Sequence, residues 1–548
     1  MGLFSTLGVG TKGLQAAQLG MDISGQNISN ADVEGYSRKR LNMAADYRKD
    51  STYGQMGFGV DVINIERMRN TFIDQQIRDQ NQQVGYYTQV DDAYQTIESV
   101  LTEPTETGLN EYLNQFFDSW HNLANNPADT SARTMVQTNG AILTSVFHNI
   151  AKQLSDYKQS RNTEITSRVD KVNEISKEVF NLNKEIASVE ITNQNANDSR
   201  DKRDKLLKDL SKIIDIDTTE NDLGQVTVTT GGSIIVSPAY QQDIETTTSS
   251  YTAADGTTVT DIGMRFADSK RSYVPGSGEL KGLLDARDVK VPEYQKKLDE
   301  LANALVMKIN EVHEKGYSLN GVSGIDFFDP TSTGASDISL SAAVLGNAQN
   351  IAAAAGGEIL VSPTKQIILN YGTPPVLKNL GNTNINQNSV VVQTGNATLV
   401  ENTDYQVDYR TGTIQLLHAG YSGATLNVSY KYTSGNSQGS GSNANAIAIA
   451  QLREQLTMVN DNLGNSTASF SEYYAGLIGK LGLDKNEATS NLDSRNQLVT
   501  QYEAQQDSVA GVSLDDEMAE IIKFQHVYQA SARLITTVSD MLDTLLKM

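Results

Sequence analysis

Histidine is the residue type in this chain best suited to metal binding and proton transfer, but its spacing supports neither. The five histidines are dispersed, and no two have the spacing of a metal site. His313 and Glu314 begin a two-histidine zinc motif, but Tyr317 occupies the position of the second histidine. The chain has no cysteine, which excludes disulfides, thiolate zinc sites and cysteine nucleophiles.

The acidic and glycine-rich segments also miss the patterns of known sites. Residues 215–224 are acidic, but Thr219 and Glu220 occupy the third-ligand and turn-glycine positions of a calcium loop. Residues 276–282, GSGELKG, have the wrong glycine spacing for a dinucleotide-binding loop. Neither a nucleophile elbow nor a phosphate loop is present in the sequence. We therefore expect no catalytic residues, no metal, no cofactor and no enzymatic activity.

Length and charge narrow the function further. A chain of 548 residues predicts several domains. Its formal net charge of −22 disfavours nucleic-acid binding, since the only compact basic cluster is Arg38, Lys39 and Arg40. No run of eighteen apolar residues occurs, and the first residues lack the basic and apolar regions of a secretory signal. We expect no nucleic acid, no membrane insertion and no cleaved leader.

The two ends of the chain have the most regular pattern. At the N-terminus, apolar or small residues alternate at spacings of four and three: Leu3, Leu7, Gly10, Leu14, Ala17, Met21, Ser24 and Ile28. Such a repeat predicts a helix that packs along one stripe. Each interior glycine costs about 0.8–1 kcal/mol relative to alanine, so this helix is expected to fold only against other helices.

A matching stripe lies at the C-terminus, where no glycine or proline follows Gly511. Its members are Ile521, Phe524, Tyr528, Ser531, Ile535, Val538, Leu542 and Leu545. The partners expected for this stripe are the N-terminal stripe and neighbouring subunits. Pairing of the two ends within one monomer stays open as the alternative.

Between the ends, the hydrophobic period changes several times. Helical spacing is predicted for 66–102, 109–123, 142–189, 199–214, 293–316 and from 447 onward, and strand-like alternation for 224–275 and 357–433. A hairpin is expected at Gly231-Gly232, a turn at 410–412, and a flexible polar linker at 433–446.

These patterns predict a multidomain α + β protein. We expect an elongated, discontinuous α-helical bundle with terminal coiled-coil helices and inserted β-rich domains. Four parts are expected: a terminal helical assembly domain (1–65 with 512–548), a helical bundle (66–214 with 445–511), a mixed β-rich domain containing helix 293–316 (215–340), and an inserted β domain with the linker (341–444).

The stretch that ends the N-terminal helix, NISNADVEGYSRKR at 27–40, resembles the N-terminal signature of flagellar rod, hook and hook-associated proteins. That signature has an N-I-x-N core followed by a glycine-aromatic pair, here Asn27, Ile28, Asn30, Gly35 and Tyr36. The continuation from Gly35 to Arg38 is similar to the hook-associated protein 1 (FlgK) family rather than to rod and hook proteins.

Further segments resemble that family in the same order. They are 116–133, 199–213, 278–288, 316–328 and 511–546, and only about 340–440 departs from the pattern. The resemblance implies a non-catalytic protein of the bacterial flagellum that joins hook to filament and leaves the cell through the flagellar type III pathway. The implied location is outside the cell, with a periplasmic flagellum left open.

The resemblance also implies partners and an assembly interface. The partners are further copies in one ring of the helical lattice, hook protein on one side, a second hook-associated protein toward the filament, and an export chaperone. The expected interface residues are Leu3, Leu7, Leu14, Met21, Asn27, Ile28, Asn30, Gly35, Tyr36, Ile521, Phe524, Tyr528, Ile535, Val538, Leu542 and Leu545.

Three alternatives to the hook–filament junction protein are another axial protein (hook protein or flagellin), a surface adhesin with β-rich binding domains, and an enzyme on an axial scaffold.

Overall fold

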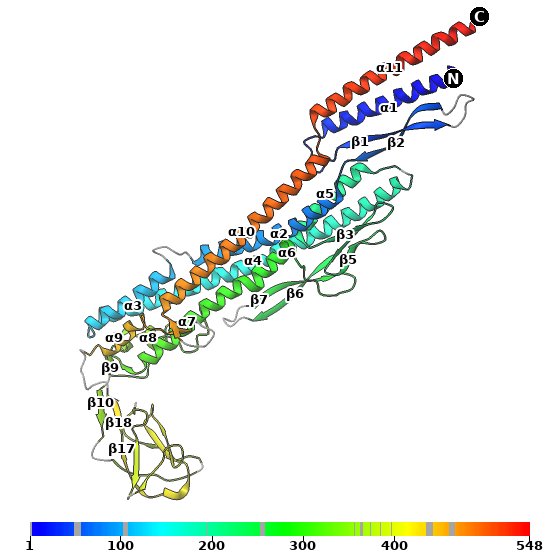
Figure 1. The fold of residues 1–548 in the computed structure, drawn as a ribbon. Coiled ribbons are helices and arrows are strands. Elements are labelled where there is room, and N and C mark those ends of the chain that lie inside the picture. The colour runs from blue at the N-terminus through cyan, green and yellow to red at the C-terminus, as the bar shows by residue number, and fades with distance from the viewer. Residues whose placement is uncertain are drawn as a thin grey trace.

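The computed structural model is an elongated chain whose two ends lie side by side (Figure 1). The terminal helices occupy one end of the molecule and a small β domain the other. The structure describes residues 3–48, 56–101, 108–192, 194–252, 258–355, 357–361, 365–372, 374–383, 385–395, 397–434, 442–459 and 466–547. None of the helices in these ranges is long and apolar enough to cross a membrane.

A shaft of long helices forms the middle of the molecule. It consists of α2 (Thr71–Leu101), α3 (Leu109–Asn125), α4 (Thr130–Glu190), α7 (Val291–His313) and α10 (Phe470–Ala510). α10 lies along α2 although the β domain separates them in sequence (Figure 1). The expected pairing of the helical blocks on either side of the insertion is therefore present in the structure.

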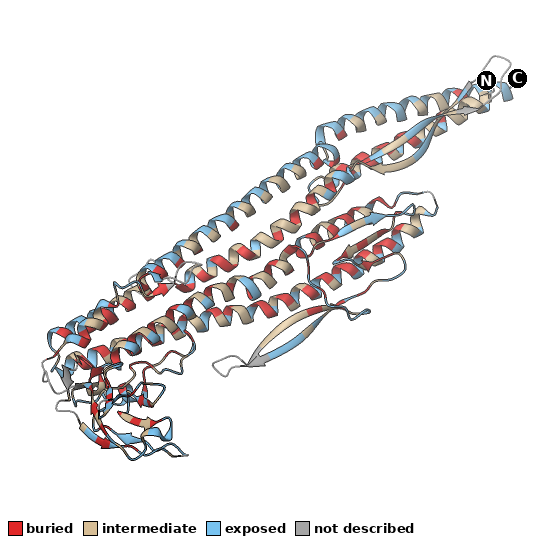
Figure 2. Cartoon of the chain, turned by 60° about the horizontal axis from the view of Figure 1, so that its bottom comes forward, coloured by how far each residue is buried: buried red, intermediate tan, exposed pale blue. Residues whose placement is uncertain are grey.

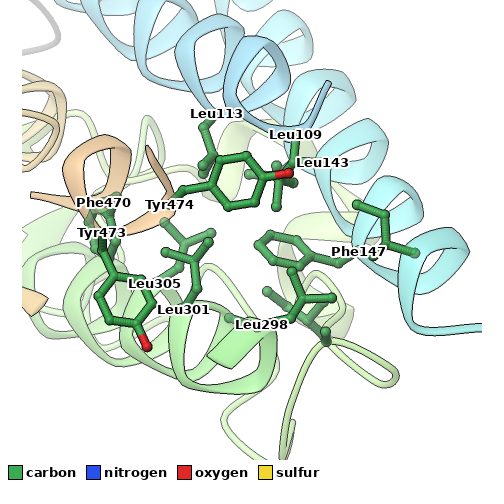
Figure 3. Close-up of a cluster of buried hydrophobic side chains, with 14 of the residues drawn as sticks. Leu109, Leu113, Leu143, Phe147, Leu298, Leu301, Leu305, Phe470, Tyr473 and Tyr474 are labelled. Carbon is green, nitrogen blue, oxygen red and sulfur yellow. The ribbon is translucent and has the colours of Figure 1, made fainter. Parts of the chain in front are cut away.

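The largest apolar core lies where α3, α4, α7 and α10 meet. Figure 3 shows side chains from all four helices pointing toward one another, among them Leu113, Phe147, Leu301 and Tyr474. Local signals define the helix starts. Asp129 caps α4 by accepting a hydrogen bond from the Ser131 amide, and Ser469 begins α10 with a reciprocal capping box.

A second core joins α4 to a group of small β elements. These are β3 (Asp217–Glu220), β4 (Val226–Thr230), β5 (Ser233–Val236), β6 (Ile244–Thr252) and β7 (Thr258–Phe266), with α5 (Asn197–Ile213), α6 (Gly278–Asp285) and the π-helix η1 (Ala286–Lys290) beside them. The strands form an antiparallel β3-β4-β5 sheet and a β6–β7 hairpin. Gly231 and Gly232 adopt φ of +53° and +72° in the β4–β5 turn, which confirms the predicted hairpin.

Three asparagines on α4 attach these strands to the helix. The amide of Asn173 accepts from the backbone N–H of Ile244 at 2.8 Å and donates to its carbonyl at 2.9 Å. Asn183 makes the same pair of bonds to Val226, and Asn162 bonds Thr260 and Ile262. Each asparagine side chain therefore pairs with the backbone N–H and C=O groups of a strand, as the peptide group of a neighbouring strand would do.

The structure corrects the expected position of helix 293–316. Leu298, Leu301 and Leu305 of α7 belong to the core shared with α3 and α4, not to the core of the β strands. The helix therefore belongs to the shaft rather than to a β-rich domain. Its apolar stripe predicted a helix but could not identify the surface that covers it.

The inserted β domain also begins later than residue 341. Val344 of α8 (Ala342–Gly346) and Ile351, after the 3₁₀ turn η2 (Ala348–Asn350), still pack in the shaft core. Nearby, β8 (Gly316–Tyr317) pairs with β9 (Ala354–Ala355). A separate core extends from Ile367 to Tyr430.

The strands of the inserted domain form three small antiparallel sheets. They are β10 (Gly357–Leu360), β11 (Lys365–Ile368), β12 (Lys378–Asn379), β13 (Val391–Thr394), β14 (Ala397–Thr398), β15 (Tyr405–Asp408), β16 (Thr413–Leu416), β17 (Thr425–Ser429) and β18 (Lys431–Ser434). The sheet orders are β10-β18, β11-β17-β13-β14 and β12-β16-β15, and the 3₁₀ turn η3 (Ala419–Tyr421) precedes β17. Gly412, with φ of +68°, ends the predicted turn between β15 and β16.

One further expectation about helix extent is wrong. The helix predicted for 66–102 starts only at Thr71, because β2 (Met56–Arg67) precedes it and pairs with β1 (Lys39–Arg48). Helix dominates from residue 447 to the end, as expected. It is interrupted where α9 (Ala444–Gln451) ends and β19 (Met458–Val459) pairs with β20 (Ser466–Ala468) before α10. Half of the linker predicted at 433–446, residues 435–441, lies outside the described residues.

Candidate assembly module and its joint to the shaft

The two ends of the chain form an antiparallel helix pair. α1 (Leu3–Ser29) lies along α11 (Leu514–Leu546), and β1 and β2 pack beside α1 (Figure 1). We call these four elements the terminal module. Figure 2 shows buried positions concentrated in the shaft, whereas α11 is mostly exposed.

Glycines allow the close approach of α1 to α11. A Cβ atom at Gly20 would lie 2.5 Å from the Phe524 ring, and one at Gly13 would lie 2.7 Å from Ser531 Oγ. At Gly10 a Cβ atom would lie 2.9 Å from Ile535 Cγ1. These glycines are unfavourable for an isolated helix, but here they bring α1 into contact with α11.

The predicted interface residues fall into three groups. Val538 is buried in the pair, and Tyr528 and Leu545 stay exposed at 38% and 56%. The remaining apolar members are half-buried: Leu3, Leu7, Leu14, Met21, Ile28, Ile521, Phe524, Ile535 and Leu542. Ile23 is also buried, although it lies outside the predicted heptad stripe. Because β2 packs on α1, this helix has a second covered face that one heptad stripe does not mark.

A lysine ties the β1–β2 hairpin to α1. Lys12 Nζ lies 2.7 Å from Asp46 of β1 and also contacts Asp61 of β2. These hydrogen bonds raise the pKa of Lys12, with Asp46 the larger cause. The bulge glycine Gly59, with φ of +98°, brings the hairpin backbone close to Val9.

Asn27 of the signature stretch connects the end of α1 to the start of β1. It is buried, and its amide donates to the Lys39 carbonyl at 2.9 Å and accepts from the Lys39 N–H at 3.0 Å. The Tyr36 hydroxyl donates to the same Asn27 oxygen at 2.8 Å. Burial, followed by nearby carboxylates, raises the pKa of Tyr36 to about 12, so this hydroxyl keeps its proton.

Asn30 and Gly35 shape the loop between these anchors. The Asn30 amide donates to the Gln26 carbonyl at 2.9 Å, one turn back in α1. Gly35 adopts φ of +86°, and a Cβ atom there would lie 3.3 Å from Lys205 of α5. The positive φ and the short distance to Lys205 explain why the first residue of the glycine-aromatic pair is glycine.

A buried ionic network lies where the terminal module meets the shaft. Arg67 Nη1 lies 3.0 Å from Asp201 and 2.6 Å from Asp204 of α5. Arg69 bonds Asp74 of α2 through two nitrogens, at 2.7 and 3.0 Å. Burial raises the pKa of Asp204, but Arg67 and Arg69 lower it more, so the net pKa is below its usual range. Asp204 is therefore ionised at neutral pH.

Ser37 and Arg38 complete the joint. Ser37 donates to Asp201 from its N–H at 3.1 Å and from Oγ at 2.6 Å. The Arg38 N–H donates to the Ala510 carbonyl at the end of α10 at 2.9 Å, and its guanidinium lies 2.6 Å from the buried carboxylate of Glu517 in α11. Arg38 therefore connects the last turn of α10 to the first turn of α11.

The joint contains open space. A cavity of about 890 Å³ lies between the 31–36 loop, the start of α2, α5 and the α10–α11 connection. Among the described residues, no three His, Cys, Asp or Glu side chains are grouped so that they could hold a metal ion.

Comparisons with known proteins agree with this architecture. The family model described as the flagellar hook-associated protein FlgK helical domain matches residues 94–328. The C-terminal model of the flagellar basal body rod FlgEFG proteins matches 505–548, and a model of a protein of unknown function matches 335–446.

Full-length relatives share one description, flagellar hook-associated protein 1. The one from Bacillus subtilis is 28% identical, with 98% of this chain and 97% of the relative aligned. The one from Salmonella typhimurium is 26% identical over 97% of this chain and 98% of its own.

A solved structure shows the same fold. It is described as the flagellar hook junction protein FlgK from Burkholderia pseudomallei, and it matches with a TM-score of 0.58 at 18% identity. The match covers 80% of this chain and all of that one. On the combined domain and full-length matches, the chain is similar over nearly its whole length to flagellar hook-associated protein 1 and is a structural component of the bacterial flagellum.

Proposed function

We propose that this protein joins the hook to the filament of the flagellum. The names of its relatives and of the solved structure support this role. The structural observation that carries it is the terminal module, in which α1 and α11 pair at one end of the molecule and leave apolar side chains uncovered.

The uncovered side chains give the module an outer face for neighbouring subunits. Leu514, Met518, Ile522 and Leu545 of α11 are each more than half exposed. Burying one such side chain contributes about 1.5–3 kcal/mol. The inner stripe, which includes Phe524, Ile535 and Val538, holds α11 on α1, and the outer face packs on other copies in the ring.

The remaining partners follow from a position at the junction. Hook protein contacts one side of the ring, and a second hook-associated protein contacts the side toward the filament. The chain is exported by the flagellar type III pathway with a chaperone. The flagellum in which it is placed is external or periplasmic.

Deletion of the gene in its motile host, followed by electron microscopy, tests the proposal. The expected result is cells that carry hooks without filaments and regain filaments when the full-length gene is restored. Normal filaments on the deletion strain would contradict a junction role. Loss of the hook itself would instead assign the protein to an earlier position in the axis.

A further inference from the structure

Helix α5 has two oppositely charged faces that contact different parts of the molecule. Asp198, Asp201 and Asp204 follow one another at three-residue spacing and face the terminal module. Arg200 and Arg203 pair mainly with Glu190 and Glu220 on the other side of the helix, although Arg203 Nε also lies 3.8 Å from Asp204. The sequence motif at 199–213 therefore lies between the terminal module and the β3–β5 sheet.

The basic face of α5 is fixed to its surroundings. The Arg203 side chain is 1% exposed, lies 3.0 Å from Glu220 of β3, and donates to the Gly224 carbonyl. Arg200 bonds Glu190 at the end of α4 at 2.8 Å and Glu220 at 2.7 Å. Leu207 and Leu210 of α5 also lie in the core shared with α4. α5 is thus a rigid part of the shaft.

The acidic face of α5 holds three separate segments of the terminal module. Asp201 receives Ser37 from the loop after α1 and Arg67 from the end of β2. Lys39 of β1 reaches Asp198. Asp201 therefore receives contacts from the loop between α1 and β1 and from the end of β2, where the chain leaves the terminal module for α2.

No apolar core crosses this joint in the described parts of the chain. None of the described residues of α1, β1, β2 or α11 belongs to any of the three clusters of buried apolar side chains. The 890 Å³ cavity leaves room beside the contacts that do exist. Since apolar packing does not fix the angle between module and shaft, directional ionic hydrogen bonds must do so.

We propose that Asp201, assisted by Asp204, is a positioning residue that sets the angle at which the terminal module leaves the shaft. A paired, buried carboxylate that accepts from a backbone N–H, a hydroxyl and a guanidinium defines one orientation for all three donors. The positioning role of Asp201 can be tested without assuming the junction function. Only its consequence rests on that proposed function, namely that the angle decides where the outer face of α11 meets neighbouring copies.

The absence of cysteine makes the angle measurable in the full-length chain. Lys177→Cys on α4 and Gln529→Cys on α11 place one spin label on an exposed position of each body. Double electron–electron resonance on the monomer then reports the distribution of distances between module and shaft. Circular dichroism and thermal melting of the same samples report whether the shaft is folded.

Asp201→Asn should broaden the distance distribution at least twofold while helicity and the melting of the shaft stay close to wild type. Asp209→Asn is the matched control, since Asp209 lies on the same helix and forms no ion pair with described residues. Its distribution should remain as narrow as that of the wild type.

Ser37→Ala keeps every charge and removes one bond to the same carboxylate, so it should broaden the distribution less. It also serves if Asp201→Asn fails to fold. A distance distribution as narrow as that of the wild type in Asp201→Asn would overturn the proposal and assign the angle to the Arg38 contacts. If Asp201→Asn does not fold, the same result in Ser37→Ala would overturn it. Because the monomer is measured, this outcome is independent of whether the protein joins hook to filament.

Discussion

The side-chain amide of Asn27 and the backbone of Lys39 exchange two hydrogen bonds, at 2.9 and 3.0 Å, in a fully buried position. An asparagine in the last turn of α1 thereby serves as the strand-like partner of the first residue of β1. This contact explains why asparagine occurs where the heptad helix ends. The chain turns there and begins a hairpin that packs on the same helix, and an asparagine side chain can bond to the backbone of such a turn.

Asn27→Asp should destabilise the terminal module. The substitution removes the donor to the Lys39 carbonyl and leaves that buried acceptor unpaired, which costs about 1–3 kcal/mol. Hydrogen exchange of 39–48 and 56–67 in the monomer measures the effect. Asn30→Asp is the control, because the Asn30 side chain donates to the exposed Gln26 carbonyl one turn back, and it should change exchange little. If the amides of the hairpin exchanged at the same rate in both variants, Asn27 would have no special role in holding the hairpin.

Two glycine substitutions in α1 should act in opposite directions. Gly8→Ala should stabilise the helix by roughly 0.8–1 kcal/mol, because a Cβ atom there meets no atom within 4 Å. Gly20→Ala should destabilise the α1–α11 pair, because its Cβ atom would lie 2.5 Å from the Phe524 ring. Protection of the α1 amides against exchange provides the readout. A gain of protection in both variants would show that the helices do not approach as described.

The terminal module should be the least protected part of the monomer. None of its described residues lies in a main apolar core, and α1 contains several helical glycines. Amides of 3–30 and 520–547 should therefore exchange much faster than those of α4 and α7 at high dilution. Protection of both ends equal to that of the shaft would show that the terminal module is as stable in the monomer as the shaft and would contradict this prediction.

Acid should weaken the shaft through His313. This side chain is buried, accepts from the Ala352 N–H at 2.8 Å, and its other ring nitrogen lies 2.6 Å from the Ile325 carbonyl. Burial lowers its pKa to about 4, whereas the unfolded value is 6.5. The folded state binds the proton less readily, so stability is complete above pH 6.5 and falls by about 3 kcal/mol as pH drops to about 4.

Chemical denaturation across this pH window measures the loss. In His313→Gln the part of the slope that comes from this histidine should disappear, whereas His526→Gln, at an exposed position of α11, should retain it. An unchanged slope in His313→Gln would assign the acid sensitivity to other groups.

Sequence periodicity predicted the long helices well because each has a continuous apolar stripe. The heptads at both ends became α1 and α11, and the stripe around Leu298 became α7. Periodicity could not identify the covering surface, so α7 was placed with the β strands although it packs on α3 and α4.

The β1–β2 hairpin was missed because its first strand lacks clean alternation. Lys39 to Arg48 reads KRLNMAADYR, and the hairpin depends on contacts with α1 such as those of Lys12. The contacts at the joint between the terminal module and the shaft could also not be predicted from the sequence. Ser37 and Asp201 are 164 positions apart, and no local pattern indicates that they bond. The signature stretch marked the right loop, and the structure supplied the partners of its residues.

The most direct test of the account replaces Leu542 and Leu545 of α11 together with serine in the full-length protein. Both lie in the C-terminal stripe, one half-buried against α1 and one exposed. Leu542→Ile with Leu545→Ile is the matched control and should form normal filaments. The serine pair is expected to be secreted, to keep wild-type melting of the shaft, and to leave hooks without filaments in electron micrographs. Normal filaments from the serine pair would show that the terminal helices are not the assembly element.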